Sequence, residues 1–123
     1  MEVEYFFDSY AAIEILKENP KYKPYTESEF TITLFNLAEI YWYVLNNFDD
    51  KTSDEVYENF RYAVVEVDDE TLKEAIKFRK QNKKKDMSYT DCIGYIYALR
   101  NNMKFLTGDK EFENMKNVEF VQE

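Results

Sequence analysis

The sequence predicts an α/β fold with a mainly parallel central sheet flanked by helices. Short runs of aromatic and β-branched residues, typical of strands, alternate along the chain with longer segments whose apolar residues have helical spacing. Strands separated by helices are joined by crossovers, which make neighbouring strands parallel. The 123 residues include only two Gly and two Pro and have the size of one domain. We therefore expect a single, compact and mostly regular domain over residues 1–123.

The first strand and helix are predicted close to the start of the sequence. Residues 3–7 read Val-Glu-Tyr-Phe-Phe, which favours a strand that ends at Asp8. Ser9 is suited to cap a helix over residues 10–18, whose Ile, Leu and small Ala side chains form an inward face. Residues 20–24 begin and end with proline, and this predicts a loop.

The centre of the chain combines a strand with a strongly apolar helix. Residues 30–33 alternate Phe and Ile with Thr and suit a buried strand, and residues 34–47 have the length and apolar density of a buried helix. Glu39 is the only charged residue between Glu29 and Asp49. An ionised carboxylate packed in a core would cost several kcal/mol of desolvation. Glu39 therefore either points to solvent from a narrow polar stripe or lines a cleft and holds a cation.

The same alternation continues after the central helix. Thr52 or Ser53, with two acids behind it, predicts a helix N-terminus. Residues 63–67 form a short apolar run that predicts a strand. Asp68 or Asp69 then caps a further helix.

The last third of the chain adds one apolar helix and two strands. Ser-Tyr-Thr-Asp at 88–91 resembles a capping box, which opens a helix over residues 92–99. Residues 104–107 predict a strand, after which Gly108 permits a tight turn. Residues 118–121 predict a final edge strand.

The composition excludes several kinds of chemistry. The only cysteine is Cys92, which excludes an internal disulfide and cysteine-cluster zinc sites. The chain has no histidine, which excludes Ser-His-Asp and Cys-His catalysis and histidine-ligated zinc. Any acid–base or metal chemistry must therefore depend on carboxylates.

The sequence also predicts where the protein resides. Residues 1–8 are too short and too acidic for a signal peptide, and no apolar run approaches the roughly 18 residues of a membrane span. We therefore expect a cytoplasmic protein that does not enter a membrane.

A small set of acids stands apart from the other acidic residues. Of the 25 Asp and Glu residues, Asp8, Glu39 and Asp91 are isolated in apolar surroundings. Asp8 and Asp109 each follow a predicted strand, and in a parallel sheet the ligand crevice lies outside the carboxyl ends of the strands. Each acid also has a structural alternative: Asp8 as a helix cap, Asp91 as a first-turn dipole partner and Asp109 as an ordinary turn residue.

Clustered carboxylates need a counter-charge. Two like charges about 4 Å apart repel by about 4 kcal/mol at an effective dielectric constant near 20. Protons or a divalent cation can relieve this repulsion. Hard oxygen ligands without His or Cys favour Mg²⁺ or Mn²⁺, which often bind together with a phosphate. The acids therefore suggest phosphodiester hydrolysis.

The charge distribution bears on a nucleic-acid substrate. The formal net charge of −9 argues against nucleic acid, which is bound chiefly through Lys and Arg. Six basic residues nevertheless lie within nine positions: Lys77, Arg79, Lys80, Lys83, Lys84 and Lys85. This run is either a solvated helix end and loop or a patch that faces phosphates.

Four motifs in order resemble those of the PIN domain family, most closely the VapC-type toxin nucleases. They are Phe6-Phe7-Asp8-Ser9, TITLFNLAEIY around Glu39, SYTDCIGYIYAL around Asp91 and KFLTGDKEFENM around Asp109. The similarity extends over nearly the whole chain, as far as the last predicted strand. It implies a Rossmann-like PIN fold and a metal-dependent endoribonuclease that hydrolyses RNA phosphodiester bonds.

The resemblance also implies the site, the cofactor and the partners. Asp8, Glu39, Asp91 and Asp109 match the catalytic and metal-binding acids, and the metal is Mg²⁺ or Mn²⁺. Ser9 and Thr107 match polar positions beside them, and we add Lys83, Lys84 and Lys85 as candidate substrate-binding residues. The implied protein is the toxin of a toxin–antitoxin pair, a homodimer inhibited by a small antitoxin whose basic C-terminal segment enters the site.

Two other functions are compatible with parts of this pattern. A catalytically degenerate PIN domain would serve as a protein-interaction or regulatory module, although the presence of all four acids argues against it. A phospho-receiver also gathers acids and Mg²⁺ at strand ends. It requires paired acids after the first strand, where this chain has only Asp8.

Overall fold

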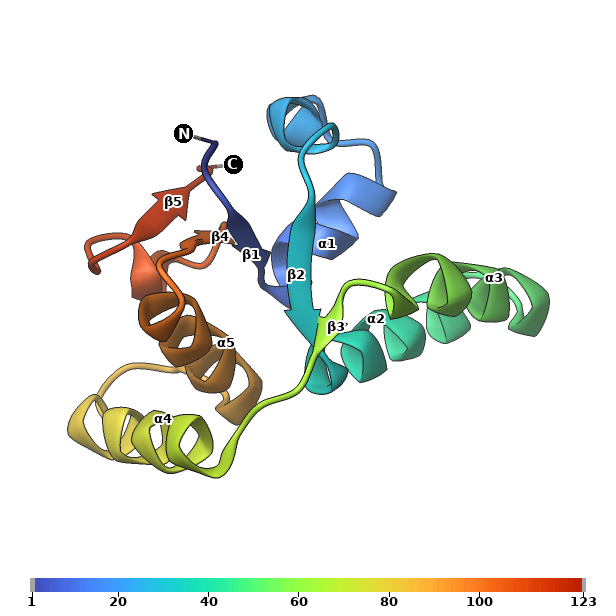
Figure 1. Cartoon of the computed structure of the whole chain (residues 1–123). Coiled ribbons are helices and arrows are strands. Elements are labelled where there is room, and N and C mark those ends of the chain that lie inside the picture. Colours follow the sequence, from blue (N-terminus) through green and yellow to red (C-terminus); the bar gives the residue numbers. More distant parts are fainter. Residues whose placement is uncertain (1, 123) are drawn as a thin grey trace.

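The computed structural model describes residues 2–122 and contains a five-stranded sheet in which every pairing is parallel. The strand order is β3-β2-β1-β4-β5 (Figure 1). The strands are β1 (Tyr5–Phe7), β2 (Phe30–Thr33), β3 (Val64–Val65), β4 (Lys104–Thr107) and β5 (Val118–Phe120). The predicted α/β class with a parallel sheet is confirmed.

Helices connect the strands. The α-helices are α1 (Ser9–Leu16), α2 (Leu34–Asn47), α3 (Asp50–Arg61), α4 (Asp69–Gln81) and α5 (Tyr89–Arg100). Two short 3₁₀ helices are η1 (Pro20–Tyr25) and η2 (Lys110–Phe112). None of the helices within residues 2–122 combines the length and the apolarity that a membrane span requires.

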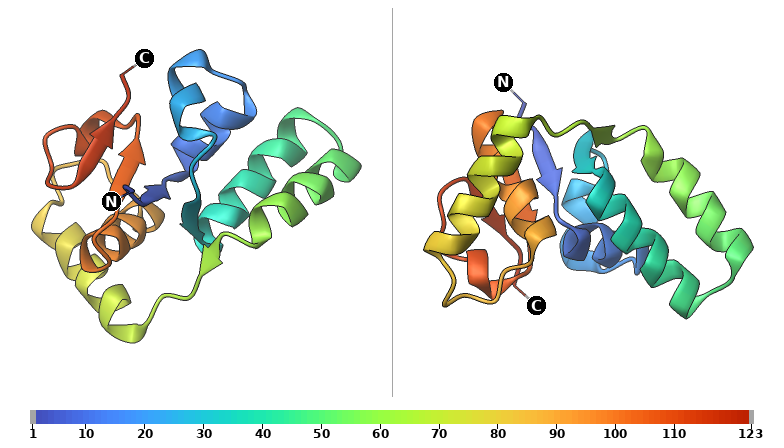
Figure 2. Two further views of the ribbon diagram at one scale, coloured as in Figure 1. Left: turned by 45° about the horizontal axis from the view of Figure 1, so that its top comes forward. Right: turned by 90° about the horizontal axis from the view of Figure 1, so that it is seen from below.

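The helices cover both faces of the sheet (Figure 2). Phe6 and Phe105 face α5 in one apolar cluster, which also includes Ala75 of α4. Their sequence neighbours, Phe7 and Leu106, belong to a second cluster with residues of α1 and α2. Successive strand residues point to opposite faces, so consecutive residues of β1 and β4 are apolar because both faces are buried there.

The strand order places a crevice beside β1. From β1 the chain builds outward through β2 and β3 on one side, and it later returns to add β4 and β5 on the other. The direction of winding therefore changes between β1 and β4. Ligands of open parallel sheets bind at such a point, beyond the carboxyl ends of the strands. Asp8 directly follows β1, and Asp109 lies two residues beyond the end of β4.

Two helices begin earlier than the sequence predicts. Asp8, not Ser9, caps α1, because its carboxylate accepts a hydrogen bond from the Ala11 N–H at 2.7 Å. Asp49 caps α3 by accepting from the Thr52 N–H at 2.7 Å, so the predicted start at Thr52 or Ser53 is wrong by about one turn. In both cases an aspartate precedes the predicted hydroxyl residue, by one position at Ser9 and by three at Thr52, and its carboxylate serves the same capping function.

Other predicted boundaries are closer to the structure. The capping box at 88–91 is confirmed, and α5 begins immediately after Ser88. Asp68 caps α4 as predicted. The strand predicted over 63–67 is reduced to Val64–Val65, because only these two residues pair with β2. The 20–24 loop contains the 3₁₀ helix η1.

Candidate active site

Asp8 is a buried carboxylate at the carboxyl end of the central strand. Its relative exposure is 2%. Its backbone N–H donates to the Leu106 carbonyl and so continues the pairing of β1 with β4 by one residue. One carboxylate oxygen caps α1, and the other accepts a hydrogen bond from the Thr107 hydroxyl. Burial raises the pKa of Asp8 to about 8, against the opposing effect of the Thr107 hydrogen bond. The negative charges of Asp91 and Asp109 raise this pKa further.

Asp109 is held beside Asp8 by the chain that follows β4. Its backbone N–H donates to the Thr107 hydroxyl oxygen at 2.9 Å, and Thr107 in turn donates to Asp8. The Asp109 carboxylate caps η2 by accepting from the Glu111 N–H at 2.9 Å. Thr107 is fully buried and joins the two acids.

Asp91 reaches the same region from the first turn of α5. Its Oδ2 accepts from the Ser88 N–H at 3.3 Å, and its own N–H donates to Ser88 Oγ at 3.0 Å. Desolvation raises the pKa of the half-buried Asp91, and the charges of Asp109 and Glu39 raise it further. Asp91 is therefore part of the capping box of α5, and its pKa is also raised by the charges of nearby acids.

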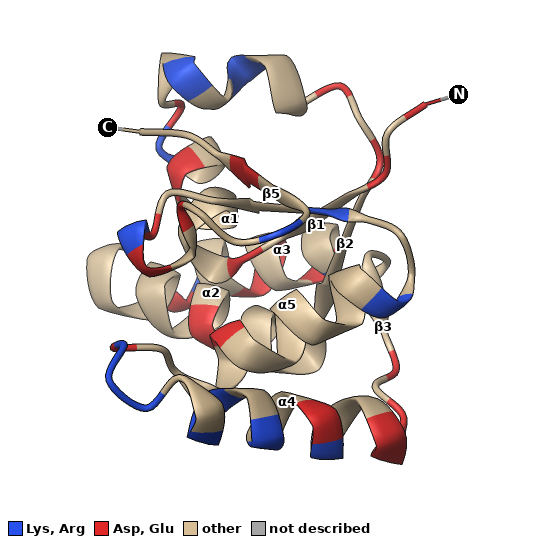
Figure 3. Ribbon diagram, turned by 90° about the vertical axis from the view of Figure 1, so that its left-hand side faces the viewer, with Lys and Arg blue, Asp and Glu red and all other residues tan. Residues whose placement is uncertain are grey.

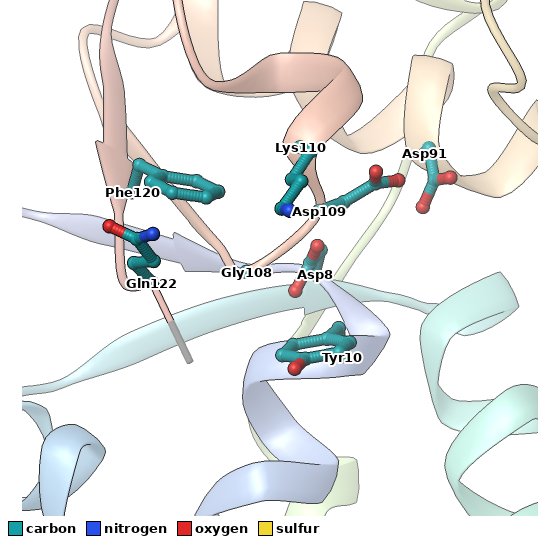
Figure 4. A pocket seen from close by; sticks show the side chains of 8 residues that line it. All are labelled: Asp8, Tyr10, Asp91, Gly108, Asp109, Lys110, Phe120 and Gln122. Carbon is teal, nitrogen blue, oxygen red and sulfur yellow. The ribbon is translucent and has the colours of Figure 1, made fainter.

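The three aspartates line one pocket of about 700 Å³. Figure 4 shows the Asp109 side chain between Asp8 and Asp91, with the ring of Tyr10 below Asp8. Lys110 brings a cationic side chain next to Asp109. The sequence prediction that strand-end acids meet at one edge of the sheet is thus confirmed for Asp8 and Asp109.

Glu39 belongs to a polar network that leads toward this pocket without being one of its lining residues. Ser9 Oγ donates to Glu39 Oε1 at 2.5 Å, and Asn36 Nδ2 donates to Ser9 Oγ at 3.0 Å. The Thr33 N–H and hydroxyl both donate to Asn36 Oδ1, so the network is anchored at the end of β2. Glu39 itself is exposed on α2, as the first alternative predicts, and its carboxylate accepts the hydrogen bond from Ser9. The second alternative, that Glu39 holds a cation, stays a prediction.

The three candidate lysines Lys83, Lys84 and Lys85 are exposed on the loop between α4 and α5. They are not among the residues that line the pocket. Lys85 Nζ donates to the Glu111 carbonyl at 3.3 Å, which ties the loop to η2. Figure 3 shows this basic loop beside the turn that follows β4, at the edge of a more acidic region.

The donor set suits a hard divalent cation. All candidate ligands are carboxylate oxygens, and burial together with the charges of neighbouring acids raises the pKa values of two of them, Asp8 and Asp91. Within residues 2–122, no group of three or more Asp, Glu or Cys side chains is close enough to form a ready ligand shell. Mg²⁺ commonly keeps several waters and uses one or two carboxylates. The pocket therefore fits an open site, with Asp8 as its buried member.

Several residues of the site were not predicted from the sequence. Asn36 is 1% exposed and links Ser9 to the end of β2. Its position three residues before Glu39, on the same face of an apolar helix, was the available signal. Tyr10, Lys110 and Phe120 also line the pocket, but nothing in their sequence context distinguished them from core or surface residues.

Known proteins share this architecture. The chain superposes on a toxin–antitoxin complex from Klebsiella pneumoniae with a TM-score of 0.78, at 15% identity over 97% of this chain and 98% of that chain. It matches VapBC-1 from nontypeable Haemophilus influenzae with a TM-score of 0.72, at 16% identity over 98% of both chains. VapBC2 from Rickettsia felis, bound to a DNA fragment from its promoter, gives 0.70 at 14% identity over 98% of both chains.

Sequence comparison identifies the family. No curated protein matches the chain in sequence. The family model described as the PIN domain matches residues 5–118, which include all five strands except the last two residues of β5. The chain therefore belongs to the PIN domain family.

Proposed function

We propose that this protein is a Mg²⁺- or Mn²⁺-dependent endoribonuclease of the VapC type, a cytoplasmic toxin controlled by an antitoxin. The observation that carries the proposal is the buried Asp8, which shares a pocket with Asp91 and Asp109 at the winding change of a PIN-family sheet. Membership of a nuclease family supplies the reaction class, and the all-oxygen donor set supports the cation. We assign the whole of residues 1–123 to this one domain.

Each residue has a distinct task in this proposal. Asp8, Asp91 and Asp109 would hold the cation, with Glu39 contributing from the outer side of the site. Thr107 fixes the orientation of Asp8, and Asn36 and Ser9 fix that of Glu39. Lys110, with Lys83, Lys84 and Lys85 farther out, would meet the phosphates of the strand. The bound cation would lower the pKa of the attacking water and offset the charge that develops on the phosphate.

The proposed activity is tested by RNA cleavage with matched variants. Wild type should cleave single-stranded RNA in Mg²⁺ or Mn²⁺ and stop when a chelator is added. Asp8→Asn and Asp91→Asn should each lower the rate by about 100-fold or more, since loss of an outer partner of a metal ligand alone costs about 10- to 100-fold. Asp68→Asn, an exposed helix cap of the same residue type, is the control and should retain wild-type activity.

The result also separates the active enzyme from a degenerate PIN domain. Equal cleavage by wild type and both site variants would indicate a contaminating nuclease and reject the assignment. A wild type without cleavage in either metal, yet able to bind a protein partner, would favour the interaction module.

We extend the proposal to the protein's partners. Structures similar in fold are described as toxin–antitoxin and VapBC complexes. A basic C-terminal segment of a small antitoxin could pair an Arg side chain with Asp8 and Asp91 in place of the cation, because guanidinium binds carboxylates bidentately. A peptide with this chemistry should inhibit cleavage. Inhibition that persists after its Arg and Lys residues are replaced by Ala would reject this mode of control.

A homodimer is the remaining part of the proposal. Large apolar side chains are exposed on α2, where Trp42 is 67% exposed and Phe35 is 46% exposed, and on α4, where Ile76 is 41% exposed. Aromatic residues are enriched at protein interfaces. Light scattering should report twice the monomer mass, and a monomer at high micromolar concentration would contradict the dimer.

A further inference from the structure

The half of the pocket farther from Asp91 has a different chemistry. Phe120 of β5 and Gln122, which follows it, form this end, and Tyr10 of α1 forms the floor (Figure 4). Both aromatic side chains are half-buried, and Gln122 is exposed. None of the three can serve as a strong ligand for a hard cation. The carboxylate chemistry therefore leaves this end of the pocket unexplained.

Gly108 shows how closely the ring of Tyr10 is fitted to this wall. A Cβ atom at position 108 would lie 2.3 Å from Tyr10 Cε1 and 2.8 Å from Tyr10 Cδ1. Gly108 does not have a positive φ, so its backbone conformation is open to other residues. The absence of a side chain at position 108 thus makes room for the Tyr10 ring and for the Tyr22 hydroxyl, which would lie 2.8 Å from the same Cβ.

We propose, on the basis of the function proposed above, that Tyr10, Phe120 and Gln122 form a subsite for one unpaired base of a single-stranded RNA substrate. Aromatic rings stack with every base, and such stacking is tolerant of sequence. The Gln122 amide can both donate and accept hydrogen bonds at a base edge. Lys110, between this subsite and Asp109, is placed to meet the phosphate that joins the bound nucleotide to the next one.

The subsite predicts a preference for unpaired RNA. A paired base cannot turn its face to a protein ring without leaving the duplex, and this step costs a few kcal/mol. A single-stranded segment presents its bases without this cost. The subsite therefore favours single-stranded segments, in which a base can reach the rings while the adjoining phosphate lies near the carboxylates.

The test measures how much of the binding depends on the base. Labelled short random-sequence RNA and an abasic ribose-phosphate strand of equal length are titrated with protein in Ca²⁺, a hard cation that prefers the same oxygen ligands. Fluorescence anisotropy reports the Kd, and a gel confirms that the strands remain intact. The variants are Tyr10→Leu, Phe120→Leu and Gln122→Ala. Phe48→Leu and Tyr62→Leu are controls, since these side chains are 65% and 76% exposed on other elements.

The expected result is a loss that is specific to the intact strand. Tyr10→Leu and Phe120→Leu should each raise its Kd by about 5- to 150-fold, which corresponds to the stacking contribution of about 1–3 kcal/mol per base. Gln122→Ala should have a smaller effect, and the controls none. Binding of the abasic strand should be weaker than that of intact RNA and unchanged in every variant. Thermal melting confirms that each variant is folded.

Three results would overturn the subsite. They are wild-type affinity for intact RNA in both aromatic variants, equal loss for the intact and abasic strands, and equal wild-type affinity for the two strands. If Phe120→Leu loses only binding of an Arg-containing peptide, the pocket receives a protein side chain instead. Each of these outcomes leaves the proposed nuclease activity intact, because that activity is judged by cleavage in Mg²⁺ or Mn²⁺.

Discussion

Asp8 and Asp68 perform the same local task in opposite environments. Each is the N-cap residue of a helix and has extended backbone dihedral angles. Each carboxylate accepts a hydrogen bond from the backbone N–H three residues later: Asp8 from Ala11 at 2.7 Å, and Asp68 from Thr71 at 2.8 Å. Asp68 is exposed, and the hydrogen bonds from Thr71 lower its pKa. Asp8 is buried, and desolvation raises its pKa to about 8.

The comparison separates what a cap requires from what the site requires. A helix cap works well on the surface, as Asp68 and Asp49 show, because the hydrogen bond stabilises an ionised carboxylate that water also solvates. Burying the same group next to Asp91 and Asp109 destabilises its charged form. The cap therefore explains the conformation of Asp8 but not its burial. The divalent cation proposed above would offset the cost of burying this charge.

The largest expected effect is an opposite pH dependence for the two caps. Between the unfolded pKa of about 4 and the folded pKa of about 8, native Asp8 retains a proton that the unfolded chain has lost. Without divalent metal, the free energy of unfolding should therefore fall as pH rises through this range, by up to several kcal/mol, and level off above it. Asp91, whose pKa is also raised, contributes in the same direction.

Matched variants isolate this effect in urea unfolding experiments with chelator. Asp8→Asn should flatten the pH profile and be more stable than wild type at pH 8. Asp68, whose pKa is lowered, stabilises the fold above its unfolded pKa and loses this contribution as pH falls, so Asp68→Asn should be slightly less stable at pH 8. Effects of the same sign at pH 8 in the two variants would contradict the comparison.

Thr107 and Thr71 provide the next contrast. The Thr107 hydroxyl donates to buried Asp8 and accepts from the N–H of half-buried Asp109, so Thr107→Val leaves both groups without this partner. We expect a loss of about 1–3 kcal/mol and a clear fall in metal-dependent cleavage. Thr71→Val, beside the exposed Asp68, should cost less and leave cleavage unchanged. Chemical unfolding and cleavage rates measure both, and equal losses of activity would remove the positioning role of Thr107.

The two glycines show a smaller difference of the same kind. A Cβ at Gly94 would lie 2.6 Å from Phe6 Cε1 in the core, and one at Gly108 would meet Tyr10 beside the pocket. Each Gly→Ala change should cost about 1–3 kcal/mol through overpacking. Only Gly108→Ala should also weaken RNA binding, because it displaces the Tyr10 ring. Melting and anisotropy measurements distinguish the two, and unchanged RNA affinity in Gly108→Ala would indicate that the ring is displaced without consequence.

Much of the fold could be predicted because local patterns and tertiary packing agree. The alternation of Phe and Ile with Thr at residues 30–33 favours a strand, and the capping box at 88–91 specifies where α5 begins. The predictions that were wrong concern helix starts where two or more nearby residues are suitable N-caps. Asp8 and Ser9 are both good caps, and only the packing of α1 against β4 and α2 decides between them.

The acids of the candidate site could be predicted from the sequence, but the residues that position them and line the rest of the pocket could not. Asp8 and Asp91 stand out because charge is rare in their surroundings, whereas Asp109 was found from its place after a strand, since strand ends converge by topology. The roles of Asn36, Tyr10 and Phe120 in the site depend on contacts between segments that are distant in sequence, and sequence periodicity cannot reveal such contacts. The lysines at 83–85 were selected for charge alone, and the structure places them on a loop outside the pocket lining.

Thermal melting with and without Mn²⁺ measures whether the pocket formed by Asp8, Asp91 and Asp109 binds a divalent cation. A ligand that binds only the native state raises stability by RT ln(1 + [L]/Kd), about 2.7 kcal/mol at 100 times Kd. With chelator as reference and constant ionic strength, wild type and Asp68→Asn should gain several degrees in Mn²⁺, and Asp8→Asn and Asp91→Asn should lose most of this gain. A wild type insensitive to Mn²⁺, or an equal gain in all four proteins, would contradict the account.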